Sequence, residues 1–418
     1  MFFCNMKNNK QIELMAPAGN FAAMQAAIDA GANSIYFGVE QLNMRARASI
    51  NFTLDDLEEI ANRCSAKDVR SYLTLNTIIY NHDLSIVKRI INQAKEKGIT
   101  AVIAADQAVI GYAHSVGMEV HISTQLNVTN IETIRFYSHF ADVMVLSREL
   151  SLRQMKEICE GVKTENITGP SGNLVEIEVF GHGALCMAVS GKCYLSLHSN
   201  NASANRGACV QNCRREYKVI DVEDGNELLI DNEYIMSPKD LCTLDFLDQL
   251  IETGISVLKI EGRGKGADYV HTTVATYRAA IDAYTEGTYT PEKVKVWMDD
   301  LRSVFNRDFW SGYYLGQKMG EWTDSSGSKA PQKKLYLGKG VHYFPKVKCA
   351  EFKIEAHSLK VGDSILIIGP TTGLVKHIVS GIRVDDKDVQ EAKKGDECTI
   401  ILEDKIRPSD KLYKLIDS

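Results

Sequence analysis

The chain has 418 residues, of which 44% are hydrophobic and 24% are charged, as in an ordinary soluble globular protein of about two domains. Its formal net charge of −6 excludes a generally basic surface, so any contact with nucleic acid requires a local patch. The apolar part of the N-terminus is too short for a signal peptide, and no apolar stretch approaches the roughly 20 residues that span a bilayer. We therefore expect a cytoplasmic protein with no membrane partner.

Short apolar segments and amphipathic segments alternate from residue 11 to about 285. The apolar segments, such as IELMAPAG and VLKIEGRG, are typical of strands buried on both faces. The amphipathic segments between them are typical of helices, and glycines such as Gly31 and Gly254 fit helix ends. Eight such units predict an α/β fold, a (β/α)₈ TIM-like barrel within residues 1–290, with a doubly wound open sheet as the alternative.

The seventh unit is interrupted by an excursion at about residues 183–240, which contains the densest group of cysteines and then a hairpin with a DG turn. Residues 291–332 are helical and then polar, which predicts a linker. Residues 333–418 alternate apolar and polar positions between glycines, which predicts a small all-β barrel domain. From Pro331 onward there are 16 Lys and Arg against 13 Asp and Glu, so this tail is either an RNA-facing module or a stabilising appendage.

Four of the ten cysteines form a constellation. Cys186, Cys193, Cys209 and Cys213 fall within 28 residues, with the spacing C-x₆-C-x₁₅-C-x₃-C. Four thiolates are the number that a 4Fe–4S cluster or a tetrahedral zinc ion needs. Structural zinc prefers two close pairs, and only the last pair is close, so the spacing favours a cluster over zinc. Inert core cysteines are the alternative, and Cys242 could replace Cys213 as the fourth ligand.

A resemblance to a known family is carried by these residues. The stretch from Glu178 to Ser196, E-x-F-x-x-G-A-L-C-x₄-G-x-C-x-L-S, resembles the signature of the collagenase-like peptidases of unassigned catalytic type, peptidase family U32. The segments ELMAPAGNFAAMQAAIDAGANSIYFG, SPKDLC, LKIEGR and FNRDFWSGYYLG match the same family, so the resemblance covers nearly the whole chain. Within this family the chain most resembles the branch of the tRNA hydroxylation protein P, and the tail resembles the second domain of translation elongation factors.

The resemblance implies an enzyme that hydroxylates RNA without dioxygen and holds a 4Fe–4S cluster on the four cysteines. It implies that the product is 5-hydroxyuridine at the wobble position in the anticodon loop of tRNA, with prephenate as the hydroxyl source. A paralogous subunit of the same family is a possible partner. A peptidase, as the family name says, is one alternative, although the sequence lacks H-E-x-x-H, G-x-S-x-G and D-[TS]-G motifs. A non-catalytic RNA-binding or assembly protein is another.

In a barrel, the residues at the C-terminal ends of the strands line the active face. A dicarboxylate such as prephenate calls for arginines, which are planar and permanently charged. The predicted substrate-binding residues are Arg45, Arg47, Arg148, Arg263, Asn20 and Gln125. The predicted catalytic residues are His182, Glu261 and Asp106. For the arginines the alternative is a salt bridge at the rim, and for His182 a structural histidine. The Arg214–Arg215 pair could contact RNA phosphate or remain solvated.

Overall fold

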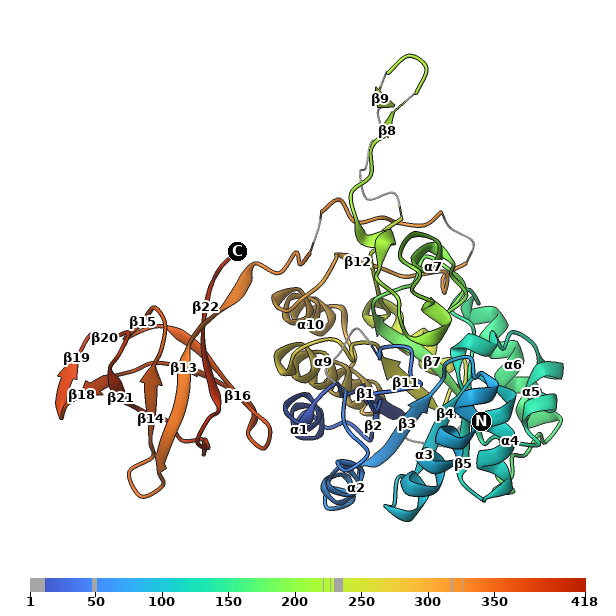
Figure 1. Ribbon diagram of the computed structural model, residues 1–418, viewed down its shortest axis with the longest axis horizontal. Coiled ribbons are helices and arrows are strands. Elements are labelled where there is room, and N and C mark those ends of the chain that lie inside the picture. The colour runs from blue at the N-terminus through green and yellow to red at the C-terminus, as the bar shows by residue number, and fades with distance from the viewer. Residues whose placement is uncertain are drawn as a thin grey trace, which may run out of the picture.

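The computed structural model describes residues 12–46, 51–220, 222–225, 227–228, 236–316, 319–325 and 327–418. A barrel wrapped by helices forms one body of the molecule, and a C-terminal set of strands lies beside it (Figure 1). A hairpin extends away from the barrel (Figure 1). None of the helices in these ranges is long and apolar enough to cross a membrane.

Eight parallel strands form the barrel. They are β1 (Glu13–Pro17), β2 (Ser34–Phe37), β3 (Arg70–Leu75), β4 (Ala101–Ala104), β5 (Glu119–Ile122), β6 (Val143–Val145), β7 (Glu176–Gly183) and β11 (Val257–Ile260). Neighbours in this order pair in parallel, and β11 closes the ring because Val257 lies opposite both Glu13 in β1 and Glu178 in β7. The predicted TIM-like barrel is confirmed, and the open sheet is excluded.

Helices cover the outside of the barrel. They are α1 (Phe21–Asp29), α2 (Leu57–Ser65), α3 (Leu84–Glu96), α4 (Gln107–Ser115), α5 (Ile131–Tyr137), α6 (Leu152–Thr164), α8 (Leu247–Glu252) and α9 (Ala267–Thr285), and α10 (Pro291–Ser303) packs on α9. Gly31 and Gly254 follow α1 and α8 with φ of +88° and +94°, as their predicted role at helix ends requires. One continuous apolar core joins the helices to the outward faces of the strands.

The inside of the barrel contains a separate apolar layer, which includes Met15, Tyr36, Tyr72 and Ile103. These side chains alternate along the strands with those of the outer core, as the two-residue period of a strand requires. The interior is therefore packed, and space for a substrate is confined to the mouth at the C-terminal ends of the strands.

The chain leaves the barrel after β7 and returns through β10 (Asp240–Cys242), which runs antiparallel to β7. Between them lie α7 (Leu195–Asn200) and the hairpin of β8 (Val219–Ile220) and β9 (Glu227–Leu228). A later strand, β12 (Phe309–Trp310), pairs with β10, so the segment after α10 folds back beside the insertion.

The C-terminal strands are antiparallel and have their own core, so the predicted all-β class is confirmed. They are β13 (Gln332–Phe344), β14 (Cys349–Ile354), β15 (Ser358–Lys360), β16 (Ser364–Gly369), β17 (Gly373–Ile378), β18 (Ile382–Val384), β19 (Lys387–Val389), β20 (Glu391–Lys393), β21 (Glu397–Ile401) and β22 (Lys411–Asp417). β17 packs on α1, where Gly373 has φ +66° and a Cβ atom would lie 3.1 Å from the nitrogen of Ala26.

Candidate active site at the barrel mouth

Glu261, directly after β11, is the centre of a charged network. Its Oε1 accepts a hydrogen bond from Arg45 at 2.7 Å, and its Oε2 accepts one from the Tyr36 hydroxyl at 3.0 Å. Burial by itself would raise the pKa of Glu261, but the nearby charges of Arg45, Arg148 and Arg263 outweigh it and lower the pKa to about 2. This carboxylate is ionised at neutral pH, which suits an anchor for arginines better than the predicted catalytic role.

Arg263 is buried and immobilised two residues further along. Its Nη1 donates to Asn43 Oδ1 at 3.1 Å and to Thr74 Oγ1 at 2.8 Å. A Cβ atom on Gly38 would lie 2.5 Å from the same Nη1, so this close approach requires glycine. Burial lowers the pKa of Arg263 to about 10, which still leaves the guanidinium charged at neutral pH.

Arg148, after β6, has an unsatisfied donor. Its guanidinium carbon lies 3.7 Å from the centroid of the Phe180 ring, and its Nη1 donates to the Ala184 carbonyl at 2.9 Å. Its buried Nε has no hydrogen-bond partner within the described part of the chain. A buried N–H without a partner is costly, so Arg148 is the predicted arginine whose surroundings most favour an anionic ligand.

The four cysteines of the insertion lie near these arginines. Cys186 is exposed, and Cys193, Cys209 and Cys213 are half-buried. The Leu195 amide N–H donates to the Cys193 sulfur at 3.4 Å, and the Ser196 hydroxyl donates to the Cys209 sulfur at 3.9 Å. Such donors are the contacts that stabilise a metal-bound thiolate.

The other three cysteines act electrostatically on Cys213. Burial raises the pKa of Cys213, Arg214 lowers it, and the charges of Cys186, Cys209 and Cys193 raise it again. The charge of Cys209 also acts on Arg45, so the thiol group and the Glu261 network are adjacent. In the ranges that the structure describes, no three His, Cys, Asp or Glu side chains are placed to hold a single metal ion.

Two glycines hold the insertion against the rim of the barrel. Gly207 has φ +78°, and a Cβ atom there would lie 2.2 Å from the Asn43 carbonyl oxygen. Gly191 has φ +76°, and its Cβ would lie 3.0 Å from Gln125 Cγ and from Met44 Cε. The insertion therefore lies over the loop after β2, which also carries Arg45.

Three predicted residues have local structural partners. Asn20 caps α1 by accepting a hydrogen bond from Ala23 N at 2.9 Å. Asp106 caps α4 and also accepts from Ile79 N at 3.0 Å. Gln125 accepts from Asn76 Nδ2 at 3.2 Å, inside the network beneath Gly191. The last predicted arginine, Arg47, lies outside the described residues.

His182 is buried beneath aromatic rings, 5.5 Å from the ring centroids of Tyr277 and Phe309. Burial lowers the pKa of His182 to about 3, so the imidazole is neutral at physiological pH. A neutral, enclosed imidazole suits the structural alternative better than a proton donor. It also lies apart from solvent, whereas Cys186 is exposed, which disfavours a Cys–His protease pair.

Several charged residues of the mouth were not predicted as catalytic or substrate-binding residues. Asp240 in β10 interacts with Arg307, Lys265 and Arg214. Together with the Glu261 network, six cationic side chains surround two carboxylates. Arg307 lies in the FNRDFW segment and Lys265 follows Arg263 by two residues, so the family motif and the strand-end rule could have indicated both. The predicted RNA contact Arg214 donates instead to the carbonyls of Pro238 and Leu185.

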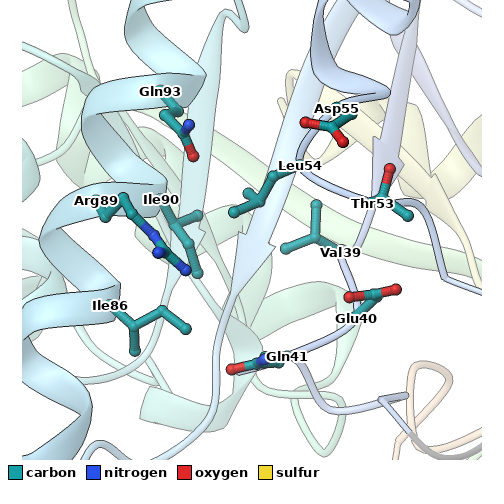
Figure 2. Close-up of a pocket in the computed structure, with 10 residues that line it drawn as sticks. All are labelled: Val39, Glu40, Gln41, Thr53, Leu54, Asp55, Ile86, Arg89, Ile90 and Gln93. Carbon is teal, nitrogen blue, oxygen red and sulfur yellow. The ribbon is translucent and has the colours of Figure 1, made fainter.

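A hollow of about 470 Å³ lies between the segment after β2 and α3 (Figure 2). Val39, Leu54 and Ile90 form an apolar part of its lining, and Glu40, Asp55 and Arg89 contribute charged groups. None of the predicted site residues lines it.

The family model and the sequence relatives are those of one family. The model described as "Peptidase family U32" matches residues 19–324. A collagenase from Porphyromonas gingivalis is 53% identical over 407 residues, which cover 97% of this chain and 98% of the relative. The tRNA hydroxylation protein P1 of Bacillus subtilis is 30% identical over 415 residues, with 97% and 95% covered. A solved U32 peptidase, Mk0906, is 11% identical and covers 61% of this chain and 95% of its own, with a TM-score of 0.39.

Proposed function

The chain belongs to peptidase family U32, and from the side chains at its barrel mouth we propose that it is an iron–sulfur enzyme that hydroxylates RNA. The observation that carries the proposal is the grouping of four cysteines, three of which act electrostatically on the fourth, beside six cations that interact with two carboxylates. The relative named as a tRNA hydroxylation protein, similar over nearly the whole chain, supports this activity.

The thiols fit a 4Fe–4S cluster chemically. Cys186, Cys193, Cys209 and Cys213 would be its ligands, and the N–H and O–H donors of Leu195 and Ser196 already point at two of the sulfurs. When bound, such a cluster supplies electron transfer or a Lewis-acidic iron at the mouth of the barrel. Arg45 donates to Glu261 and lies within the electrostatic reach of Cys209, so the proposed cluster would lie beside the Glu261 network.

The cations suit an anionic hydroxyl donor, for which we propose prephenate. Its two carboxylates match planar guanidinium groups. Arg148 has a buried N–H without a partner, and Arg263 is held rigidly by Asn43 and Thr74. Such immobilised arginines bind a carboxylate with little loss of conformational entropy.

The RNA substrate we propose is the anticodon loop of tRNA, modified to 5-hydroxyuridine at the wobble position. A base in a single-stranded loop can be unstacked without melting a helix, and it stacks readily on aromatic side chains. Tyr194, which follows Cys193, is 76% exposed and offers such a ring. A paralogous subunit remains a possible partner in this reaction.

Iron analysis tests the proposal directly. The full chain purified without oxygen should contain about four irons and four sulfides, and Cys193→Ala should lose most of both. Cys349→Ala, in β14 of the C-terminal sheet, is the matched control and should retain them. Transfer RNA from a strain without the gene should lack 5-hydroxyuridine, and only the wild-type and control genes should restore it. One zinc, or no metal after reconstitution, would overturn the cluster.

Peptidase activity is the second candidate, because the Porphyromonas gingivalis relative named collagenase is 53% identical. The same variants separate the two activities. If the wild type and Cys193→Ala cleaved collagen equally well and neither modified uridine, proteolysis and not RNA hydroxylation would be the activity of this protein.

A further inference from the structure

Lys265 is one of the six cations at the mouth, and the proposed cluster and hydroxyl-donor sites leave it without a role. It belongs to the turn after β11, where its backbone N–H donates to the Gly262 carbonyl at 2.8 Å. The Tyr269 hydroxyl donates to the Glu261 carbonyl at 2.9 Å, and its ring lies 2.6 Å from the position of a Cβ on Gly262. The turn is therefore held rigidly, and the lysine side chain begins from a fixed point.

The amine of Lys265 lies against aromatic rings. Its Nζ is 2.8 Å from the Phe305 centroid and 5.8 Å from the Tyr269 centroid. The guanidinium of Arg307 lies 5.0 Å from the same Phe305 ring, so two cations share one aromatic surface. This arrangement desolvates the amine and places a like charge beside it.

The nearby carboxylates are bound to other cations. Asp240 lies 3.5 Å from Arg307 Nη1 and also accepts from its backbone N–H, while Glu261 holds Arg45 at 2.7 Å. Lys265 makes no salt bridge with any carboxylate of the described residues. The charged groups that face its amine are Arg307, Asp240, Glu261 and Arg45. Burial lowers the pKa of Lys265, Arg307 lowers it further, and the result is about 7.

We propose that Lys265 is the proton-accepting residue of this site, taking a proton from the base that is being modified. The inference rests on the proposed function, because hydroxylation of a pyrimidine carbon requires that carbon to lose its hydrogen. The step moves only a proton: once the oxygen has bonded to that carbon, an Nζ–H bond forms, the carbon–hydrogen bond breaks, and its electron pair restores the double bond of the ring. The side chain is half-buried, so the proton can return to water afterwards.

A purely electrostatic role for Lys265 fits the surroundings less well. The mouth already contains permanently charged arginines, which hold carboxylates and phosphates better than a lysine does. An amine that its neighbours deprotonate near neutral pH is a poor fixed charge but a suitable base. The two roles differ in one respect, because arginine can replace a fixed charge and cannot replace a base.

The first measurement needs no turnover. The anaerobically purified full chain is treated with limiting acetic anhydride at a series of pH values, and acetylation of each lysine is followed by mass spectrometry. We expect half-maximal labelling of Lys265 near pH 7. Lys346, exposed after β13, serves as the reference within the same chain. Labelling of Lys265 with a midpoint near that of an ordinary lysine, about 10.4, would overturn the proposal.

The second measurement compares Lys265→Arg and Lys265→Gln with Lys346→Gln in uridine hydroxylation from pH 5.5 to 9. The wild-type rate should rise with pH through about 7, and both Lys265 variants should lose about 100-fold or more and lose that rise. Unchanged melting temperatures exclude misfolding. An active Lys265→Arg variant would show that this position needs only a positive charge, and it would refute the role of Lys265 as a base. A wild-type chain that modifies no RNA would instead refute the proposed function, and the role of Lys265 with it.

Discussion

The barrel holds two charged regions that are built differently. Inside the barrel, the buried cation Lys259 has its own acid, since it lies 2.8 Å from Glu178, which is also buried. At the mouth, six cations interact with the two carboxylates Asp240 and Glu261. A buried ion pair whose charges cancel is accounted for by the fold alone, whereas an excess of positive charge calls for an anionic ligand. The comparison separates structural charges from functional ones.

The largest expected effect comes from breaking the interior pair. Lys259→Met removes the cation and leaves Glu178 buried without a partner, which should reduce the free energy of unfolding by about 3–5 kcal/mol. Urea unfolding measures this change. Replacing both residues with methionine should recover much of the loss, because no buried charge then remains. Lys97→Met, at the exposed pair with Glu58, is the control and should leave stability nearly unchanged. Equal effects at the two sites would contradict the comparison.

The next effect is a pH dependence at the mouth. The folded-state pKa of Glu261 is about 2, below the roughly 4.3 of an unfolded chain, so its contribution is present above pH 4.3 and lost as the pH falls toward 2. Wild type should therefore exceed Glu261→Gln in stability by about 3 kcal/mol near neutrality, and the gap should close in that acid range. Unfolding at a series of pH values measures the gap. Glu157→Gln, at an exposed pair, should show little difference at any pH.

A third test measures whether the cations at the mouth bind an anionic ligand. Arg148→Ala removes the guanidinium whose Nε has no partner among the described residues, together with its contacts to the Ala184 carbonyl and the Phe180 ring. Affinity for prephenate should fall by about 10- to 100-fold, as expected for one charge-assisted hydrogen bond of about 1.5–3 kcal/mol. Calorimetric titration of the full chain with prephenate measures this. Arg153→Ala, an exposed arginine on α6, should bind like wild type. If Arg148→Ala bound prephenate as tightly as the wild type, the unpaired Nε of Arg148 would have no part in prephenate binding.

The barrel could be predicted because its signal is local and repeated. Each strand is a short apolar run and each helix ends at a residue such as Gly31 or Gly254, so eight units could be counted along the chain. The grouping of the cysteines was likewise visible in their spacing. These features depend on neighbours within a few tens of residues.

The charged mouth could be predicted only in part. The strand-end rule found Arg45, Arg148 and Glu261, but it could not give their pairing, because that depends on loops meeting in space. Arg307 reaches the site through the pairing of β12 with β10, across about 70 residues, and no local pattern encodes that return. The protonation state of Lys265 depends on the same folding back of the chain, since Phe305 and Arg307 lie beside its amine.

The strand-end rule also selected Asn20, and the smallest predicted effect tests that choice. The position after a barrel strand is also the position before a helix, where Asn, Asp and Ser are favoured as caps, and Asn20 accepts from Ala23 N. Asn20→Ala should therefore lower the free energy of unfolding by about 1 kcal/mol, while Asn20→Ser should stay near wild type. Both variants should bind prephenate normally, as titration would show. If Asn20→Ser kept its stability but bound prephenate less tightly, the Asn20 side chain would belong to the ligand site. The ligand site would then include a residue that also caps α1.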